Sequence, residues 1–212
     1  MSRTRISTLT AVTAATLMVA GCKSEPAKAG PTSAPAAKAA APASAPAAAA
    51  DPGGLKVDAA ASSIGWEANK VTLKHTGNFG VLTGEVWLDG DAPKGIEFTV
   101  QTASVTADNV KLQGHLKTAD FLDVAKFPTS TFKSKSIAAG PAGHTITGDL
   151  TLHGMTKELS FPATITVSSK GVTGKADLTF NRKDFGLVYP GMADDLIADN
   201  VTLKINLSFP RG

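Results

Sequence analysis

The sequence predicts an all-β domain that carries one short helical insert and follows a leader and a low-complexity linker. Apolar and polar residues alternate along many short segments, turn-forming residues separate these segments, and one stretch, 112–132, fits neither pattern. Alternation with a period of two gives a strand one apolar and one polar face, which is typical of antiparallel sheets. Many such strands with short links form a sandwich or a barrel, and alternation alone does not choose between them.

The first 21 residues have the pattern of a secretory signal peptide. Arg3 and Arg5 form a basic start, a short apolar run follows, and small residues precede Cys22. The apolar run is shorter than the about 20 residues of a transmembrane helix. Residues 19–22, Val-Ala-Gly-Cys, resemble the lipobox of bacterial lipoproteins. This resemblance implies that Cys22 is lipidated and becomes the first residue of the mature chain.

A lipidated Cys22 would make this an exported protein that is anchored in the bacterial envelope and faces the periplasm. Each buried methylene contributes about 0.8 kcal/mol, and more than one acyl chain gives stable anchoring. Lys23 stands where enterobacterial lipoproteins of the inner membrane have an aspartate, which favours the outer membrane over the inner one. Cys22 is the only cysteine, so the chain forms no internal disulfide.

Residues 22–54 comprise the lipidated cysteine and a linker. Between Lys23 and Ala50 there are 14 alanines and 5 prolines, and no Val, Ile, Leu, Met or aromatic residue. Such a segment cannot bury enough apolar surface to offset the entropy lost on ordering, so we expect disorder. We interpret it as a spacer between membrane and domain, although low complexity without a role has the same composition.

Residues 55–212 are long enough for one well-buried domain. The alternation is clearest at the end of the chain, where five apolar residues from Val201 to Phe209 alternate with polar ones. The same pattern occurs in the segments 64–68, 82–88, 96–100, 146–152 and 172–180. Turn residues at 89–93, 140–143 and 168–171 separate the strands.

Three glycines, Gly84, Gly148 and Gly174, fall on the apolar faces of expected strands. A glycine in such a place can relieve crowding at a bend or leave room for a ligand. Simple tolerance of a glycine is the alternative, and the sequence leaves this choice open.

The β pattern breaks at Leu112–Phe132. Asp108 or Asn109 can cap a short helix there, and Gly114 weakens that helix. We expect a second turn at 120–124, which ends at the Phe-Pro pair 127–128 because the residue before a proline avoids the helical conformation. The chain then returns to strand at 129–132.

Several motifs in order resemble the YceI-like domain family. They include KHTGNFG at 74–80, GDLTLHGMTK at 148–157 and NRKDFGL at 181–187, and the others are segments 57–66, 114–124, 127–132 and 197–201. The resemblance covers essentially all of 55–212. Leu122 departs from the pattern where a second phenylalanine is common. Asn181 stands where an acidic residue is common, which could remove an ion pair with Arg182.

The resemblance implies a lipocalin-like, eight-stranded antiparallel β-barrel. Family members hold a long apolar molecule in it, such as a polyisoprenoid, an isoprenoid quinone or a fatty-acid derivative. A barrel of about eight strands is wide enough for its own side chains or for one slim ligand. We expect the insert to cover part of the barrel mouth, held by Leu116, Phe121 and Phe132.

The candidate ligand-binding residues are the inward-facing apolar side chains, and the prediction is collective because each one alone also fits ordinary core packing. They are Trp66, Phe79, Val86, Phe98, Val100, Leu116, Phe121, Leu152, Phe161, Leu178, Phe180, Phe185 and Leu203. The expected partners are an apolar lipid or isoprenoid quinone and, through Cys22, a membrane. Nucleic acid is not expected, because the formal charge of +3 includes two arginines of the leader.

The sequence contains no recognisable catalytic or metal-binding motif. The four histidines, His75, His115, His144 and His153, lack other ligands at metal-site spacing. His75 and His153 lie in the family motifs, where we expect them to hold a turn or line the mouth. There is no Gly-x-Ser-x-Gly elbow and no phosphate-binding glycine loop. We therefore expect neither an enzyme nor a cofactor.

Two alternatives stay open at this point. The first is a structural or interaction protein of the envelope, whose barrel is packed solidly and holds no ligand. The second is an enzyme that uses a histidine and aspartate cluster assembled in space. Asp194 and Asp195 could form a pair of carboxylates, but a solvated acidic loop explains them more simply.

Overall fold

The structure, a computed structural model, describes residues 53–192 and 195–212. The signal peptide 1–21, the lipidated Cys22 and the linker up to residue 52 lie outside the described residues, so these three expectations stay predictions. Neither the α-helix nor the 3₁₀ helices of the described part are long and apolar enough to cross a membrane.

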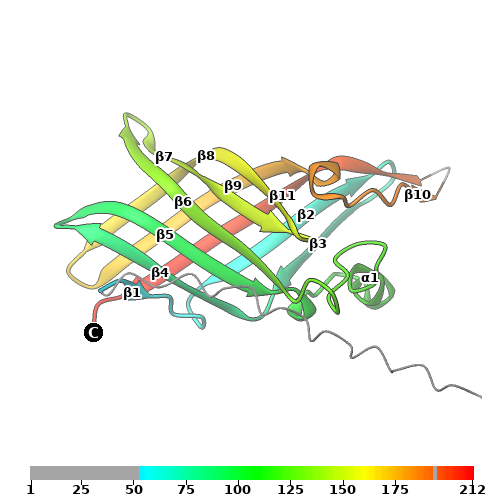
Figure 1. Cartoon of the computed structure of the whole chain (residues 1–212), viewed down its shortest axis with the longest axis horizontal. Coiled ribbons are helices and arrows are strands. Elements are labelled where there is room, and N and C mark those ends of the chain that lie inside the picture. The colour runs from blue at the N-terminus through cyan, green and yellow to red at the C-terminus, as the bar shows by residue number, and fades with distance from the viewer. Residues whose placement is uncertain (1–52, 193–194) are drawn as a thin grey trace, which may run out of the picture. The chain divides into compact units, whose positions relative to one another are not determined.

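The described residues form a curled antiparallel sheet, one α-helix and two 3₁₀ helices (Figure 1). The strands are β1 (Leu55–Lys56), β2 (Ser63–Lys70), β3 (Lys74–Phe79), β4 (Leu82–Asp89), β5 (Ala92–Gln101), β6 (Thr129–Gly140), β7 (Gly143–Leu152), β8 (Met155–Ser168), β9 (Gly171–Asn181), β10 (Gly191–Met192) and β11 (Asp195–Pro210). The helices are η1 (Thr102–Ser104), α1 (Val110–Leu116) and η2 (Arg182–Phe185).

The sheet follows the order β1-β4-β5-β6-β7-β8-β9-β11-β2-β3, and β10 pairs with β11. The expectation of an all-β fold with one short helix is confirmed. The described residues have eleven strands where eight were expected. Two of them, β1 and β10, are short pairings of two residues each, and the nine longer strands exceed the expected number by one.

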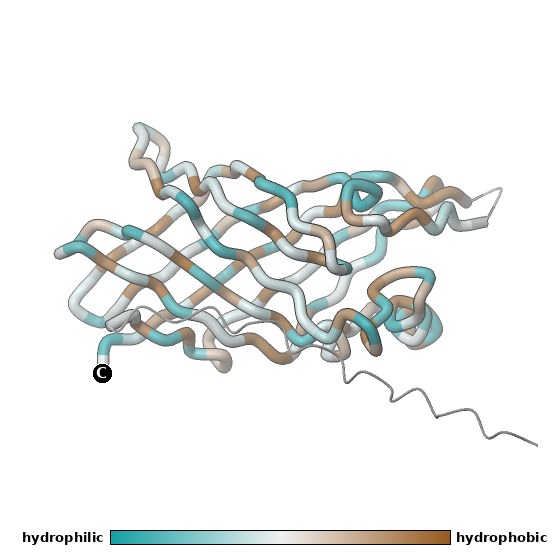
Figure 2. Tube along the Cα trace, viewed as in Figure 1, coloured by the Kyte–Doolittle hydropathy of each residue, from teal (hydrophilic) through white to brown (hydrophobic). Residues whose placement is uncertain are grey.

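The alternation places the core inside the curled sheet. On β11, Leu203, Ile205, Leu207 and Phe209 are buried, whereas Lys204 and Asn206 between them are exposed. Figure 2 shows the same alternation of hydrophobic and hydrophilic residues along neighbouring strands. Inward residues of opposed strands therefore share one core, as the period of two requires.

The turn chemistry agrees with the predicted loops. β4 and β5 are joined through Gly90, which has a φ of 62°, a left-handed conformation that glycine adopts without strain. β7 and β8 are joined by His153 and Gly154, with φ values of 52° and 73°. Two successive positive φ angles define the type I′ turn, whose twist matches a tight hairpin.

The sheet is closed by segments that lie beside its edges. Near the C-terminal end of β11, the amides of Val57 and Asp58 donate to the carbonyls of Gly84 (2.9 Å) and Ser208 (2.8 Å), so residues 57–58 bridge β4 and β11. Near α1, residues 104–108 lie along β3. Pairing of both free edges gives the sheet a barrel-like closure.

The insert begins with α1, two residues before the predicted stretch. The side chain of Asn109, rather than that of Asp108, caps the helix by accepting hydrogen bonds from the amides of Lys111 (2.9 Å) and Leu112 (3.2 Å). Residues 117–126 form successive turns, in agreement with the turn expected at 120–124, and Asp123 has a φ of 42°. β6 begins directly after Pro128, as expected.

Candidate ligand-binding cavity

The interior of the barrel contains a cavity of about 110 Å³ at the end that carries α1. Its wall is apolar except for Ser130 and Arg182. The lining residues are Ile64, Trp66, Ala68, Phe79, Phe98, Val100, Val105, Leu116, Phe121, Leu122, Ser130, Leu150, Leu152, Phe180, Arg182, Leu187, Ile197, Val201 and Leu203. An apolar cavity inside the barrel counts against the alternative of a solidly packed interior.

Nine of the predicted residues lie in this wall. They are Trp66, Phe79, Phe98, Val100, Leu116, Phe121, Leu152, Phe180 and Leu203. They come from β2, β3, β5, β7, β9, β11 and the insert, so the structure brings together side chains that are up to 137 positions apart in the chain. Their role in binding a ligand is a proposal.

Four predicted residues, Val86, Phe161, Leu178 and Phe185, are buried but do not line this cavity. Phe161 lines a smaller space deeper in the barrel. Phe185 lies edge-on against Phe180, with ring centroids 5.1 Å apart, and so supports a wall residue from behind. Alternation identifies which face of a strand is inward, but it does not say how far along the barrel a residue lies.

The wall also contains residues that the prediction did not name. Ile64, Ala68, Leu150 and Val201 follow the same alternation as the named residues, so the sequence carried a signal for them. Other unnamed members are Val105, Leu122, Ser130, Arg182, Leu187 and Ile197. These lie outside the regular ladder or are polar, and periodicity gives no reason to place them in the wall.

The insert covers the α1 end of the cavity. Leu116, Phe121 and Leu122 line the cavity from this side. The rings of His115, Phe121 and Tyr189 form a cluster with centroid separations of 4.9–5.2 Å. His115 Nε2 also lies 2.7 Å from Asp120 Oδ2, which ties the end of α1 to the following turn. The insert therefore lies where the prediction placed it, but Phe132, which was expected to hold it, packs deeper in the barrel against Phe98 and Phe161.

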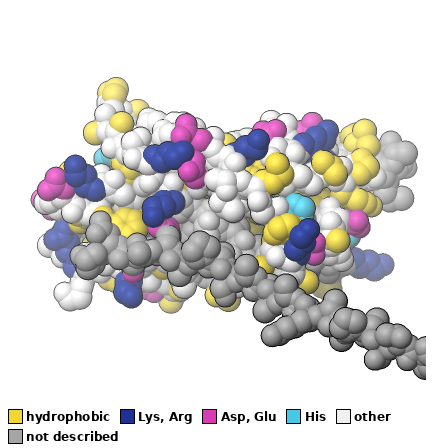
Figure 3. Space-filling model, in the orientation of Figure 1, with side chains coloured by type: hydrophobic (Ala, Val, Ile, Leu, Met, Phe, Trp, Pro, Cys, Tyr) yellow, Lys and Arg dark blue, Asp and Glu magenta, His cyan; other side chains and the backbone are white. Residues whose placement is uncertain are grey.

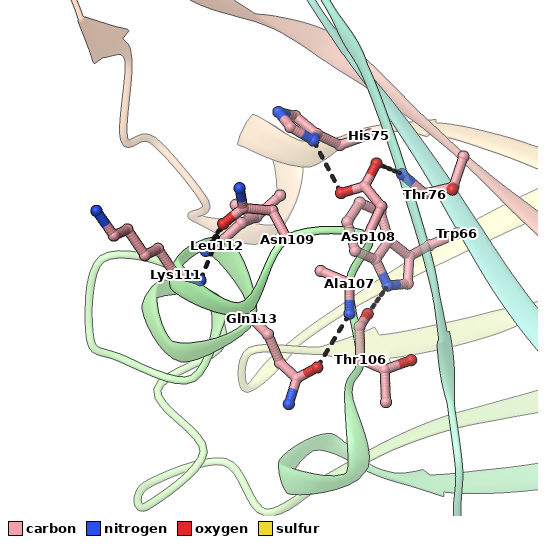
Figure 4. A network of polar contacts seen from close by, with 10 residues as sticks. All are labelled: Trp66, His75, Thr76, Thr106, Ala107, Asp108, Asn109, Lys111, Leu112 and Gln113. Carbon is pink, nitrogen blue, oxygen red and sulfur yellow. Dashed lines mark hydrogen bonds and ion pairs between the residues drawn. The ribbon is translucent and has the colours of Figure 1, made fainter.

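A network of polar contacts holds the approach to α1 against β3 (Figure 4). The amides of Thr106 and Asp108 donate to the carbonyls of Asn78 (2.8 Å) and Thr76 (2.9 Å). The Asp108 carboxylate accepts from the amide of Thr76 (3.1 Å) and lies 3.0 Å from His75 Nδ1. Hydrogen bonding from His75 lowers the pKa of the Asp108 carboxyl below its usual range.

Trp66 joins this network to the cavity wall. Its indole Nε1 donates to the carbonyl of Thr106 (3.1 Å), while its ring lines the cavity. Gly77 allows this close approach, because a Cβ there would lie 2.7 Å from Trp66 Nε1 and would collide with Thr106. The motif that contains His75 and Gly77 thus shapes the edge of the cavity and closes the barrel.

Arg182 is a buried cation in the wall, with 3% of its surface exposed. The ladder between β11 and β2 is interrupted between Ile197 and Val201, which is typical of a β-bulge. The guanidinium donates to the carbonyls of Ile197 (3.2 Å), Ala198 (3.0 Å) and Leu187. Burial lowers the pKa of Arg182, and Asp199, 3.9 Å away, opposes this. Arg182 therefore satisfies carbonyls that the sheet leaves unpaired.

Three of the four histidines, His75, His115 and His153, serve as contacts between segments. His75 pairs with Asp108 and His115 pairs with Asp120, and neither histidine lines the cavity. His153 Nδ1 lies 3.2 Å from the carbonyl of Phe185, and its ring lies edge-on against Phe127. Within residues 53–192 and 195–212, no group of three or more His, Cys, Asp or Glu side chains is arranged to hold a metal ion.

Charged side chains of both signs are interspersed on the face of the described domain seen in Figure 3. On β6, Lys135 lies 2.7 Å from Asp149 and 2.8 Å from Glu158, and these contacts raise its pKa, with the Asp149 bond contributing most. Lys204 pairs in the same way with Asp177 at 2.7 Å. Such pairing neutralises individual cations on the outer surface of the sheet.

Comparison with known proteins matches this domain to one family. The model of the YceI-like domain family matches residues 55–209. A UPF0312 protein of Pseudomonas putida is 34% identical over 141 residues, which are 62% of this chain and 70% of the relative. A UPF0312 protein of Pseudomonas savastanoi pv. phaseolicola is 32% identical over 142 residues, covering 63% and 71% of the two chains.

Solved structures share the fold. BcnA of Burkholderia cenocepacia aligns with a TM-score of 0.64 and 24% identity over 72% of this chain and 98% of its own. A polyisoprenoid binding domain from Saccharophagus degradans, implicated in plant cell wall breakdown, aligns with a TM-score of 0.61 and 17% identity, covering 74% and 98%. The YCEI protein of Campylobacter jejuni aligns with a TM-score of 0.52 and 23% identity, covering 62% and 83%.

Proposed function

The chain belongs to the YceI-like domain family, and from this premise we propose that it is an envelope-anchored protein that holds a long apolar ligand inside its barrel. The observation that carries the proposal is the apolar cavity between the strands and the insert. A polyisoprenoid, an isoprenoid quinone or a fatty-acid derivative has the matching chemistry. The similarity to the polyisoprenoid binding domain of Saccharophagus degradans supports this ligand class.

Burial of apolar groups is sufficient to retain such a ligand. Each methylene contributes about 0.8 kcal/mol, so a chain of about 20 carbons gains roughly 16 kcal/mol before costs. Association costs on the order of 4–15 kcal/mol. The balance requires few polar contacts, in keeping with a wall whose polar members are Ser130 and Arg182.

A ligand of that length must displace some of the cavity wall. A cavity of about 150 Å³ accommodates benzene, and the cavity here has about 110 Å³. Leu116, Phe121 and Leu122 belong to α1 and the turns after it, outside the sheet. They can move without breaking strand pairing, so we propose that the insert shifts outward when the ligand enters.

Mass spectrometry of organic extracts tests the ligand proposal. The full chain is expressed in bacteria, purified from the membrane fraction and extracted with organic solvent. We expect an apolar compound of defined mass in stoichiometric amount, and saturable binding of ubiquinone analogues or polyprenols to the extracted protein. Several preparations without a bound compound, together with no binding of either probe, would refute the proposal.

The proposed anchor at Cys22 has its own test. We expect wild-type protein in the outer-membrane fraction, labelled by a clickable fatty acid supplied to the cells. The Cys22→Ser variant should lose the label and appear in the soluble fraction. Equal labelling of the two proteins, or equal membrane retention, would overturn the anchor without touching the ligand proposal.

A further inference from the structure

Three aromatic rings form a layer across the inside of the barrel. Phe98 on β5 and Phe132 on β6 are direct register partners, and their ring centroids stack at 5.3 Å. Phe161 on β8 lies edge-on against Phe132 at 5.5 Å. All three are buried. We call this layer of Phe98, Phe132 and Phe161 the aromatic floor.

A second space lies beyond the aromatic floor. It has about 20 Å³, and its wall includes all three floor residues. Phe98 belongs to the walls of both cavities. On β5 the wall passes from Val100 in the upper cavity to Ile96 in the lower one, and on β11 it passes from Leu203 to Ile205. The interior is therefore one channel that the aromatic floor divides.

Two glycines let the strands that carry Phe98 and Phe132 lie close to their neighbours. Gly84 lies opposite Phe98 in the register of β4 and β5, and a Cβ at Gly84 would lie 3.0 Å from the Phe98 Cβ. A Cβ at Gly148 would lie 2.6 Å from Phe132 Cζ. Real side chains do not approach so closely without displacement of a neighbour. Gly148 thus makes room for the Phe132 ring, and Gly84 makes room for the β5 backbone at Phe98.

Gly174 differs from these two glycines. It lines the lower cavity, and a Cβ built at Gly174 would meet no atom within 4 Å. The lower cavity therefore has unfilled room on the side of β9. This room is separated from the upper cavity by the floor and becomes available to a ligand when a floor ring is removed.

We propose that the aromatic floor sets the length of apolar chain that the barrel can bury, an inference that rests on the proposed function. The ligand chain enters at the α1 end, and its last carbons stop against Phe98, which stacks on Phe132 beyond it. Carbons beyond that length stay outside the mouth. Affinity therefore rises about fourfold for each further methylene until the upper cavity is filled, and then levels off.

The test uses the full chain after extraction and a series of straight-chain fatty acids of increasing length, with calorimetric titration as the readout. In Phe98→Ala, affinity should continue to rise to longer chains than in wild type, because the lower cavity joins the upper one. Val100 lies on β5 two residues from Phe98, on the same face and nearer the mouth. In Val100→Phe, affinity should level off at shorter chains.

Phe209→Ala is the matched control, since Phe209 is equally buried but lines neither cavity. It should leave the levelling length unchanged. Identical levelling lengths in wild type and Phe98→Ala would overturn the inference. If Phe98→Ala does not fold, Phe98→Leu, which also removes the ring, takes its place: a longer limit supports the floor, and an unchanged limit refutes it. If wild type binds no chain of any length, the proposed function fails as well.

Discussion

His75 and Asp108 join β3 to the segment that leads into α1, with Nδ1 of the histidine 3.0 Å from Oδ1 of the aspartate. The same carboxylate accepts the amide of Thr76. The contact lies beside the Trp66 hydrogen bond that closes the barrel edge. A single pair of side chains therefore connects two segments that are 33 positions apart.

This pair predicts a loss of stability in acid. The folded state lowers the pKa of Asp108, chiefly through the hydrogen bond with His75. An unfolded aspartate has a pKa of about 3.9, so the contribution is present above this pH and is lost as the pH falls through the folded pKa. We expect Asp108→Asn to be less stable than wild type at neutral pH, with the difference vanishing in strong acid. Urea unfolding across this pH range measures the effect.

His75→Phe provides the partner test for the acid effect. It removes the hydrogen bond that lowers the Asp108 pKa, so its pH profile should approach that of Asp108→Asn. A His75→Phe profile that keeps the full acid slope of wild type would show that the slope originates in other carboxylates.

We expect replacement of the buried Arg182 to destabilise the protein far more than replacement of its neighbour Lys183. Arg182→Met leaves the carbonyls of Leu187, Ile197 and Ala198 without their donor in a buried place. An unsatisfied buried group costs about 1–3 kcal/mol, so we expect a loss of about 3–5 kcal/mol in the free energy of unfolding. Chemical denaturation monitored by circular dichroism measures this loss.

Lys183→Met is the control for Arg182. Lys183 is half-exposed and pairs with Asp199 at 2.8 Å. An exposed ion pair contributes about 0–1 kcal/mol, so this variant should be nearly as stable as wild type. Equal losses in the two variants would show that Arg182 does not support the bulge between Ile197 and Val201.

Replacement of Phe121 tests whether the insert stabilises the fold and retains the ligand. Its ring lines the cavity and contacts His115 and Tyr189. Phe121→Ala removes this packing, and we expect the free energy of unfolding to fall by about 2–4 kcal/mol and a bound apolar chain to dissociate faster. Lys117→Ala, at the C-cap of α1, should change neither quantity. If both variants behave alike, the insert is only a connector.

The sequence was sufficient for β2, β4, β5, β7, β9, β11 and the start of β6, and for the position of the insert, but it did not predict β3 or β8. Alternation from Val201 to Phe209 reflects burial on one face, which is a local property of a strand. The alternation is weak where pairing is incomplete. In β8, residues 155–158 are all exposed, and this half of the strand does not pair with β9. Because neither face of this segment is buried, its sequence shows no alternation of apolar and polar residues.

The polar parts of the site could not be predicted, because their partners are distant in the chain. Charged side chains are rarely buried, so nothing in the sequence places Arg182 inside. Its carbonyl partners are free only because the ladder shifts between Ile197 and Val201. The glycines are similar. Gly84 is required by the β5 backbone at Glu97 and Phe98, and Gly148 by the Phe132 ring and the β6 backbone, and alternation along one strand does not show these neighbours.

Gly77 predicts a purely steric effect at the cavity edge. A Cβ at Gly77 would collide with the Thr106 carbonyl and lie 2.7 Å from Trp66 Nε1. Gly77→Ala should push residues 104–108 away from β3 and break the Trp66 hydrogen bond. Overpacking costs about 1–3 kcal/mol and the lost bond about 1 kcal/mol, so we expect a total of about 2–4 kcal/mol. Unfolding monitored by tryptophan fluorescence reports both events.

Gly80→Ala separates this steric effect from the general cost of replacing a glycine. A Cβ at Gly80 would lie 3.6 Å from the Ser104 carbonyl, an ordinary contact, and neither glycine has a positive φ. Replacing either glycine with alanine lowers the conformational entropy of the unfolded chain by a similar amount. Both glycines also lie close to the same segment, so the two variants differ mainly in the clash. Gly80→Ala should therefore be neutral within about 0.5 kcal/mol. Equal destabilisation of the two variants would mean that the contact between Gly77 and Thr106 does not hold the barrel edge closed.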